Sequence, residues 1–179
     1  MNAIIDANVA VLRRHEKVLK RMHDDDYQCR LDGVFGGSIG VHTRHILDHY
    51  ACFFRGLESG NLDYENRDRD PELEANRRAA IAAITHVCGA LTGRKSLQRD
   101  RSLLLSALSA HQPAQSVTSV HRELEFLLGH TLHHHSLLAV MCRLLGVSIE
   151  PGFGFATATL RHWARKPATA GLRRAWRIA

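Results

Sequence analysis

The longest stretch of helical periodicity in the chain runs from Ser119 to Gly146, and it also holds the densest group of histidines. Glu123 lies on the predicted apolar stripe of this helix, two turns before His130. A buried polar group without a partner costs roughly 1–3 kcal/mol, so polar side chains on this stripe need partners, of which a divalent metal is one and a water-filled cleft another. At 3.6 residues per turn, the stripe consists of Phe126, Leu127, His130, His134, Leu137, Leu138, Met141 and Leu145.

Histidines are so frequent in this chain that their spacing alone does not identify a site. With 13 histidines in 179 residues, about one pair at i,i+4 spacing is expected by chance. The chain has two such pairs, so His130 and His134 are either metal ligands or histidines satisfied within the core or at the surface. On the same helix, His133 is predicted at the edge of the stripe, beside the ligands, and His135 is predicted to face solvent.

A second histidine-rich helix is predicted to begin after Ser38, a good N-cap, and to end between Gly56 and Gly60. Its apolar face is flanked by three histidines at positions i, i+3 and i+7. This flank either covers the edge of a helix interface or supplies a metal ligand opposite the first histidine group. The three are His42, His45 and His49.

Two further amphipathic helices and a short hairpin complete the predicted fold. Apolar periodicity predicts a first helix over residues 2–22, followed by a polar, glycine-containing connection. Asp70 and Pro71 mark the start of a helix that continues to Gly93. The period fails over residues 95–118, where two short extended arms predict a hairpin. After Gly146 the chain is glycine-rich and aromatic without a period, and Tyr64 and Arg67 are candidates for the rim of a cleft.

Composition indicates one globular domain and argues against nucleic acid as the main partner. The chain is 45% hydrophobic and 23% charged, with no apolar run long enough to span a membrane. The net charge of +6 is accounted for by six basic residues in the last nineteen positions, so the body is close to neutral. The four cysteines are scattered singly, which favours reduced thiols and a cytoplasmic location.

The segments SIGVHTRHILDHY and HRELEFLLGHTLHHHSLLAV resemble the DinB/YfiT-like superfamily, and FGFATATLRH resembles one bacterial branch of it. The similarity extends from the first helix to about His162, which predicts a DinB-like domain over residues 1–162 and a basic tail over residues 163–179. The resemblance implies an all-α fold, an up-and-down four-helix bundle, and a homodimer. We expect the small hairpin to precede the last long helix.

The resemblance also implies a divalent metal held by three histidines. By position these are His45 from the second helix and His130 and His134 from the fourth, with His42 and His49 flanking the single histidine. Three neutral imidazoles suit zinc or nickel, with iron as a further candidate, and leave a position open for water or substrate. His49 is the candidate proton acceptor. Glu123 is either an orienting group or one half of a buried ion pair with Arg44 or Arg122.

These features predict a metal-dependent enzyme, a transferase or hydrolase that activates a thiol or water against a small-molecule substrate. Relatives imply a low-molecular-weight thiol as cosubstrate. The alternative is a non-catalytic metal-binding or stress-response protein, whose ligand sphere would be completed by protein side chains such as His49. A third hypothesis, nucleic-acid association, depends on the basic tail alone.

Overall fold

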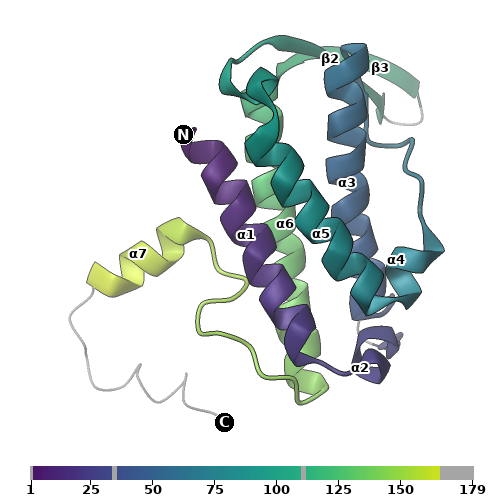
Figure 1. The fold of residues 1–179 in the computed structure, drawn as a ribbon, viewed down its shortest axis with the longest axis vertical. Helices are drawn as coiled ribbons and strands as arrows, with labels where there is room; N and C mark the ends of the chain where they lie inside the picture. Colours follow the sequence, from purple (N-terminus) through teal and green to yellow (C-terminus); the bar gives the residue numbers. More distant parts are fainter. Residues whose placement is uncertain (1, 34–35, 110–111, 166–179) are drawn as a thin grey trace.

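The computed structural model describes residues 2–33, 36–109 and 112–165. In these ranges the chain is mainly helical and carries a small three-stranded sheet (Figure 1). Four long helices pack together: α1 (Ala3–Arg21), α3 (Ile39–Ser59), α5 (Arg77–Gly93) and α6 (Val120–Leu144). The prediction of a mostly helical chain is therefore confirmed.

The helices begin at polar caps and bury an apolar face. The side chains of Asn2, Ser38 and Ser119 accept backbone N–H groups in the first turns of α1, α3 and α6. Gly60, in the left-handed region with a φ of 80°, ends α3. The largest side chains of the shared core include Leu12, Leu19, Ile46, Tyr50, Phe53, Ile84, Leu91, Leu124, Leu127 and Met141.

The helix predicted from Pro71 to Gly93 is divided in two. Residues Pro71–Ala75 form α4, and α5 starts anew at Arg77. Asn76 between them is extended, and its side chain accepts the backbone N–H groups of Arg78 and Ala79. An asparagine side chain can bind backbone N–H groups in place of the helix, so Asn76 ends α4 and caps α5.

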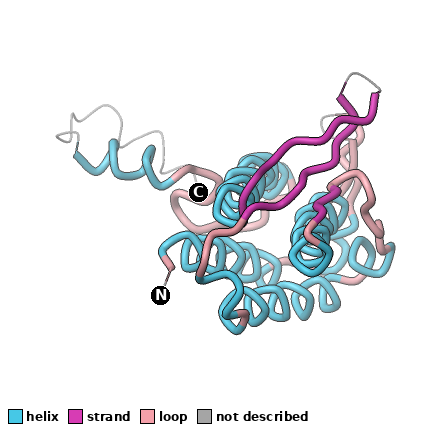
Figure 2. The backbone as a smooth tube through the Cα atoms, turned by 90° about the horizontal axis from the view of Figure 1, so that it is seen from above, coloured by secondary structure: helices cyan, strands magenta, loops and turns pink. Residues whose placement is uncertain are grey.

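The predicted hairpin is present and forms part of a sheet. Strand β2 (Ser102–Ser109) pairs antiparallel with β3 (Gln112–Ser119), from Ser102↔Ser119 to Ser109↔Gln112. Strand β1 (Asn61–Asp63), which the sequence did not predict, adds in parallel to β2 with Asn61 opposite Leu104. Figure 2 shows the two longer strands crossing the end of the helices, from which β3 continues directly into α6.

Short helices occupy three segments in which the sequence predicted none. Helix α2 (Asp24–Gln28) buries Tyr27, whose hydroxyl donates to the carbonyl oxygen of Leu73 at 2.6 Å. The 3-10 helix η1 (Lys95–Gln98) precedes the sheet. Helix α7 (Thr157–Arg165) lies apart from the four long helices in Figure 1. Most of the predicted basic tail lies outside the described residues.

Within the described residues, no helix combines the length and the apolar character that crossing a lipid bilayer requires. Cys52, Cys88 and Cys142 are buried as free thiols in α3, α5 and α6, as expected of reduced packing residues.

A histidine cluster between two helices as candidate metal centre

Helices α3 and α6 face each other in antiparallel directions, and each contributes histidines to the space between them. His45 of α3 lies opposite His130 of α6, whereas His42, one turn earlier on α3, lies opposite His134, one turn later on α6. The two histidine-rich helices are thus neighbours, as the sequence interpretation required. All the predicted metal ligands, His45, His130 and His134, gather in this one cluster.

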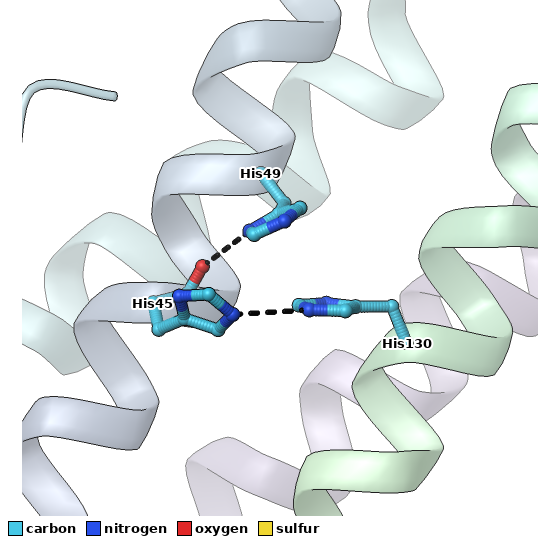
Figure 3. A group of neighbouring side chains, drawn as sticks. All are labelled: His45, His49 and His130. Carbon is cyan, nitrogen blue, oxygen red and sulfur yellow. Dashed lines mark hydrogen bonds between the residues drawn. The ribbon is translucent and has the colours of Figure 1, made fainter. Parts of the chain in front are cut away.

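His45 and His130 are in direct contact across the interface between α3 and α6. Their Nε2 atoms lie 3.1 Å apart (Figure 3). Two nitrogen ligands of a tetrahedral zinc ion, each bonded at 2.0–2.1 Å, are ~3.3 Å apart. The separation of the two Nε2 atoms is therefore close to the distance between two ligand atoms in such a site.

His49 completes a compact group with these two residues. Its Nδ1 donates to the carbonyl oxygen of His45 at 2.8 Å, which leaves the lone pair of the neutral ring on Nε2. Its ring stacks on that of His130 with centroids 3.9 Å apart. One possible ligand atom from each of His45, His49 and His130 lies within 4.8 Å of the others, so this trio meets the geometric requirement for a metal-binding group.

His134 adjoins this group and contacts a further histidine. Its ring centroid lies 4.7 Å from that of His45 and 4.6 Å from that of His130. Its Nδ1, however, lies 3.1 Å from Nδ1 of His42. The sequence placed His42 beside His45 on a flank that could supply a metal ligand, but helical spacing does not show which side chain on the facing helix it meets.

Burial keeps these imidazoles in the form that binds metal. Removal from water, with the neighbouring histidines adding to it, lowers the pKa of His45 to about 4, of His134 to about 3 and of His130 to about 2. All three are therefore neutral at pH 7, and a metal ion requires the neutral imidazole.

Two buried ring nitrogens in the cluster lack a hydrogen-bond partner among the described residues: Nε2 of His42 and Nδ1 of His130. A buried nitrogen of this kind is costly unless a ligand, ion or water satisfies it. The set of donors consists of neutral imidazoles, which zinc, nickel, copper and iron accept. The residues present therefore fit a divalent metal ion.

Glu123 is buried beside the cluster and is connected to it through Tyr64. The carboxylate, 1% exposed, accepts hydrogen bonds from Tyr64 Oη at 2.9 Å and Thr118 Oγ1 at 2.6 Å. The Tyr64 ring in turn stacks on His49, with centroids 5.3 Å apart. Of the two ion pairs considered from the sequence, the structure has the one with Arg122, at 3.6 Å.

Arg44, the other cation considered for Glu123, binds elsewhere. Its guanidinium donates to Asp48 at 2.8 Å and to Glu74 at 3.1 Å, which ties α3 to α4. Arg67 helps to hold Tyr64 in position, because it donates to the carbonyl oxygen of Tyr64 at 2.7 Å. Tyr64 and Arg67 thus lie near the histidines.

The prediction that His135 faces solvent is wrong. Its ring is fully buried, stacks on Phe153 with centroids 4.4 Å apart and meets His15 edge-on at 5.0 Å. The loop carrying Phe153 approaches α6 so closely that a Cβ at Gly154 would meet the His135 carbonyl oxygen at 2.9 Å. Helical periodicity does not reveal this cover, because the loop follows α6 in the sequence and folds back onto it.

A polar pocket of about 340 Å³ lies one turn beyond His49, beside Cys52 and Arg55. Burial raises the pKa of the Cys52 thiol. Arg55 donates to Cys52 Sγ at 3.2 Å but also to Asp68 at 2.7 Å, so its charge is shared. A buried thiol with a raised pKa is a packing residue and not an activated nucleophile.

Together, the fold and the cluster define a helical protein with an imidazole-rich site between two long helices. Residues 1–162 match the DinB family. The chain therefore belongs to the DinB family, which confirms the resemblance found in the sequence.

Other similarities are partial. Over 105 residues the chain is 33% identical to FK506-binding protein 5 of Rhizopus delemar, a match that covers 56% of this chain. The chain spans about a quarter, 27%, of the length of that curated relative. No solved structure matches the chain.

Proposed function

We propose that this protein binds a divalent metal ion between α3 and α6 and uses it to activate a thiol or water against a small-molecule substrate. The observation that carries the proposal is the 3.1 Å approach of His45 Nε2 and His130 Nε2 across the helix interface. The architecture that we infer is the up-and-down four-helix bundle of the DinB type. Metal sites in bundles are built from side chains on facing helices.

His45 and His130 are the central ligands in this proposal, and His134 is the third. A bound zinc or nickel ion lowers the pKa of a coordinated water or thiol. His49, with the lone pair on Nε2, is placed to accept the released proton. If His49 instead provides the third nitrogen, as the compact trio allows, another group must accept that proton.

Aromatic side chains form a wall at the His49 end of the cluster. Tyr64 and Phe126 contact each other with ring centroids 5.0 Å apart, and both contact His49. Glu123 holds the Tyr64 hydroxyl, so its role is to orient this wall. The wall reduces access of bulk water to the proton acceptor.

A transferase or hydrolase of this type acts on a small molecule, with a low-molecular-weight thiol as cosubstrate. We further propose a cytoplasmic homodimer in which residues 1–162 form the catalytic domain and residues 163–179 form a basic extension. The excess positive charge lies in the last nineteen residues, so we expect neither nucleic acid nor membrane as the main partner.

A non-catalytic metal-binding or stress-response protein is the second candidate. The observation that favours it is the number of imidazoles, since His42 and His49 both adjoin the three predicted ligands. If protein side chains filled every coordination position, no position would remain for a thiol or water.

Metal analysis of the protein purified without a histidine tag tests the proposal. We expect at least one equivalent of zinc or nickel per chain, and loss of most of it in His130→Ala. His86→Ala, an exposed histidine on α5, is the matched control and should retain the metal. Less than half an equivalent, unchanged by His130→Ala, would remove the basis for the proposal. Proton relaxation of the copper- or manganese-loaded protein measures the exchange of coordinated water and distinguishes the two candidates. Rapid exchange supports the enzyme, and its absence supports the non-catalytic protein.

A further inference from the structure

Within the cluster, ring nitrogens of α3 and α6 histidines approach each other in two interhelical pairs. His45 contacts His130 through their Nε2 atoms, and His42 contacts His134 through their Nδ1 atoms, each pair at 3.1 Å. Each helix therefore contributes one nitrogen to each pair. Both separations are close to the distance of ~3.3 Å expected between two nitrogen ligands of a tetrahedral ion.

The two pairs are displaced along the helices by about one turn. His42 and His45 are three residues apart and His130 and His134 are four residues apart, which corresponds to roughly 4.5–6 Å along a helix. Metal ions in two-metal sites lie about 3.5–4 Å apart. The displacement along the helices is slightly larger than the distance between two such ions. Side chains of the two pairs that incline toward each other would bring the ions to that distance.

The third ligands divide in the same way. Among the described residues, the group whose ligand atoms all lie within 4.8 Å is His45, His49 and His130, without His134. Nδ1 of His134 contacts Nδ1 of His42, and the second ring nitrogen of His42, Nε2, is buried without a hydrogen-bond partner among the residues that the structure describes. A single ion shared by His45, His130 and His134 leaves the contact between His134 and His42 without a role.

We propose that the cluster holds two metal ions, one between His45, His49 and His130 and a second between His42 and His134. This inference rests on the proposed function, namely that the facing histidines of α3 and α6 bind metal. It adds a second metal position and assigns His49 to the first ion as a ligand.

His133 is the candidate third ligand of the second ion. Its ring lies 5.3 Å from that of His134. Its side chain is exposed and so is free to reorient when an ion binds. Both positions would then have three imidazoles, a donor set that suits zinc, nickel and copper.

Calorimetric titration of the metal-free full chain with Zn²⁺, followed by desalting and metal analysis, tests the second position. We expect two equivalents per chain in the wild type and in His86→Ala, and one in His42→Ala. His133→Ala should weaken the second binding step by at least about 10-fold and leave the first unchanged. His42→Gln provides the same test if the alanine variant does not fold.

The outcomes separate this inference from the proposed function. One equivalent in the wild type, unchanged in His42→Ala, would overturn the two-ion inference and leave the single site intact. No bound metal at all would overturn both. Two equivalents that persist in both His42 variants would place the second ion elsewhere and would also overturn the inference.

Electron paramagnetic resonance of the copper-loaded protein supplies a readout of distance. Two Cu²⁺ ions on neighbouring turns are expected to give a dipolar-broadened spectrum with a half-field transition at two equivalents. The spectrum of His42→Ala should be that of an isolated ion. An isolated-ion spectrum in the wild type at two equivalents would show that the ions are distant, contrary to the proposal.

Discussion

The Nε2 atoms of His45 and His130 lie 3.1 Å apart although 85 residues separate the two histidines in the sequence. The approach depends on the antiparallel packing of α3 against α6, which places one turn of each helix opposite one turn of the other. Because rigid helices carry both side chains, their relative position is set by the core and not by a loop. Changes at the histidines and changes in the core should therefore have separable effects.

Removal of His130 should abolish tight metal binding without unfolding the protein. The ring lies between those of His45, His49 and His134, so His130→Ala removes one contact to each of these three. Mutation of a residue that hydrogen-bonds to a metal ligand lowers metal affinity by roughly 10–100-fold. We expect loss of the ligand itself to lower the affinity for zinc by more than this. Competition with a chromophoric chelator measures the affinity, and an affinity within threefold of the wild type would contradict the ligand role.

Metal-free protein should lose stability as the pH falls below neutrality. Burial lowers the pKa of His15 to about 3, whereas the same imidazole in the unfolded chain has its ordinary value of 6.5. Between these two values the unfolded state binds more protons, so the free energy of unfolding decreases as the pH falls from about 6.5 toward 3. Urea unfolding at pH 7.5, 6 and 5 measures this slope.

His15→Gln should reduce the pH dependence but not abolish it, because the pKa values of His45, His130 and His134 are also lowered in the folded protein. A glutamine side chain does not titrate and retains a group able to hydrogen-bond to Thr43 Oγ1, which His15 Nε2 contacts at 3.1 Å. The same slope in wild type and variant would show that His15 is not responsible.

Truncation of Glu123 should destabilise the fold more than it affects metal binding. Glu123→Ala leaves the hydroxyls of Tyr64 and Thr118 without their acceptor, at roughly 1–3 kcal/mol for each hydroxyl that stays buried and unpaired. Glu123→Gln retains one acceptor oxygen and should lose less. Unfolding free energies and metal content together check this expectation. Loss of metal in Glu123→Gln at unchanged stability would instead make Glu123 a participant in the metal site.

Gly40 should tolerate no side chain. A Cβ there would overlap the backbone carbonyl oxygen of Glu74, where α3 and α4 are in closest contact. We expect Gly40→Ala to cost about 1–3 kcal/mol, as overpacking typically does. Gly89→Ala, on the exposed face of α5 with open space around it, should stabilise the protein by about 0.5–1 kcal/mol. Thermal melts compare the two, and equal stabilities would contradict the close α3–α4 contact.

Local sequence signals were sufficient to predict the long helices and the hairpin. Ser38, Ser119 and Gly60 act where their capping chemistry predicts, and failure of the helical period over residues 95–118 indicates the strands. Strand β1 was missed because three residues are too few for a periodic signal, and its pairing with β2 is set by the end of α3. Asparagine favours helix N-caps, but the apolar periodicity on both sides of Asn76 led to the prediction of one continuous helix.

The gathering of the cluster's histidines was predictable from the sequence, but their pairing was not. Helical spacing and the family resemblance brought together His45, His49, His130 and His134, which do lie in one cluster. The register between α3 and α6 decides that His42 faces His134, and register depends on packing of the whole core. For the same reason the burial of His135 by the loop around Phe153 was not visible in the sequence.

X-ray absorption at the metal edge of the zinc-loaded protein tests the central claim most directly. The account predicts a first shell dominated by nitrogen at about 2.0–2.1 Å, with the outer scattering of imidazole rings. The shell should lose imidazole scattering in His45→Ala and in His130→Ala, but not in His86→Ala. A shell of oxygen ligands alone, or a spectrum that neither variant changes, would contradict the convergence of α3 and α6 histidines on a bound metal.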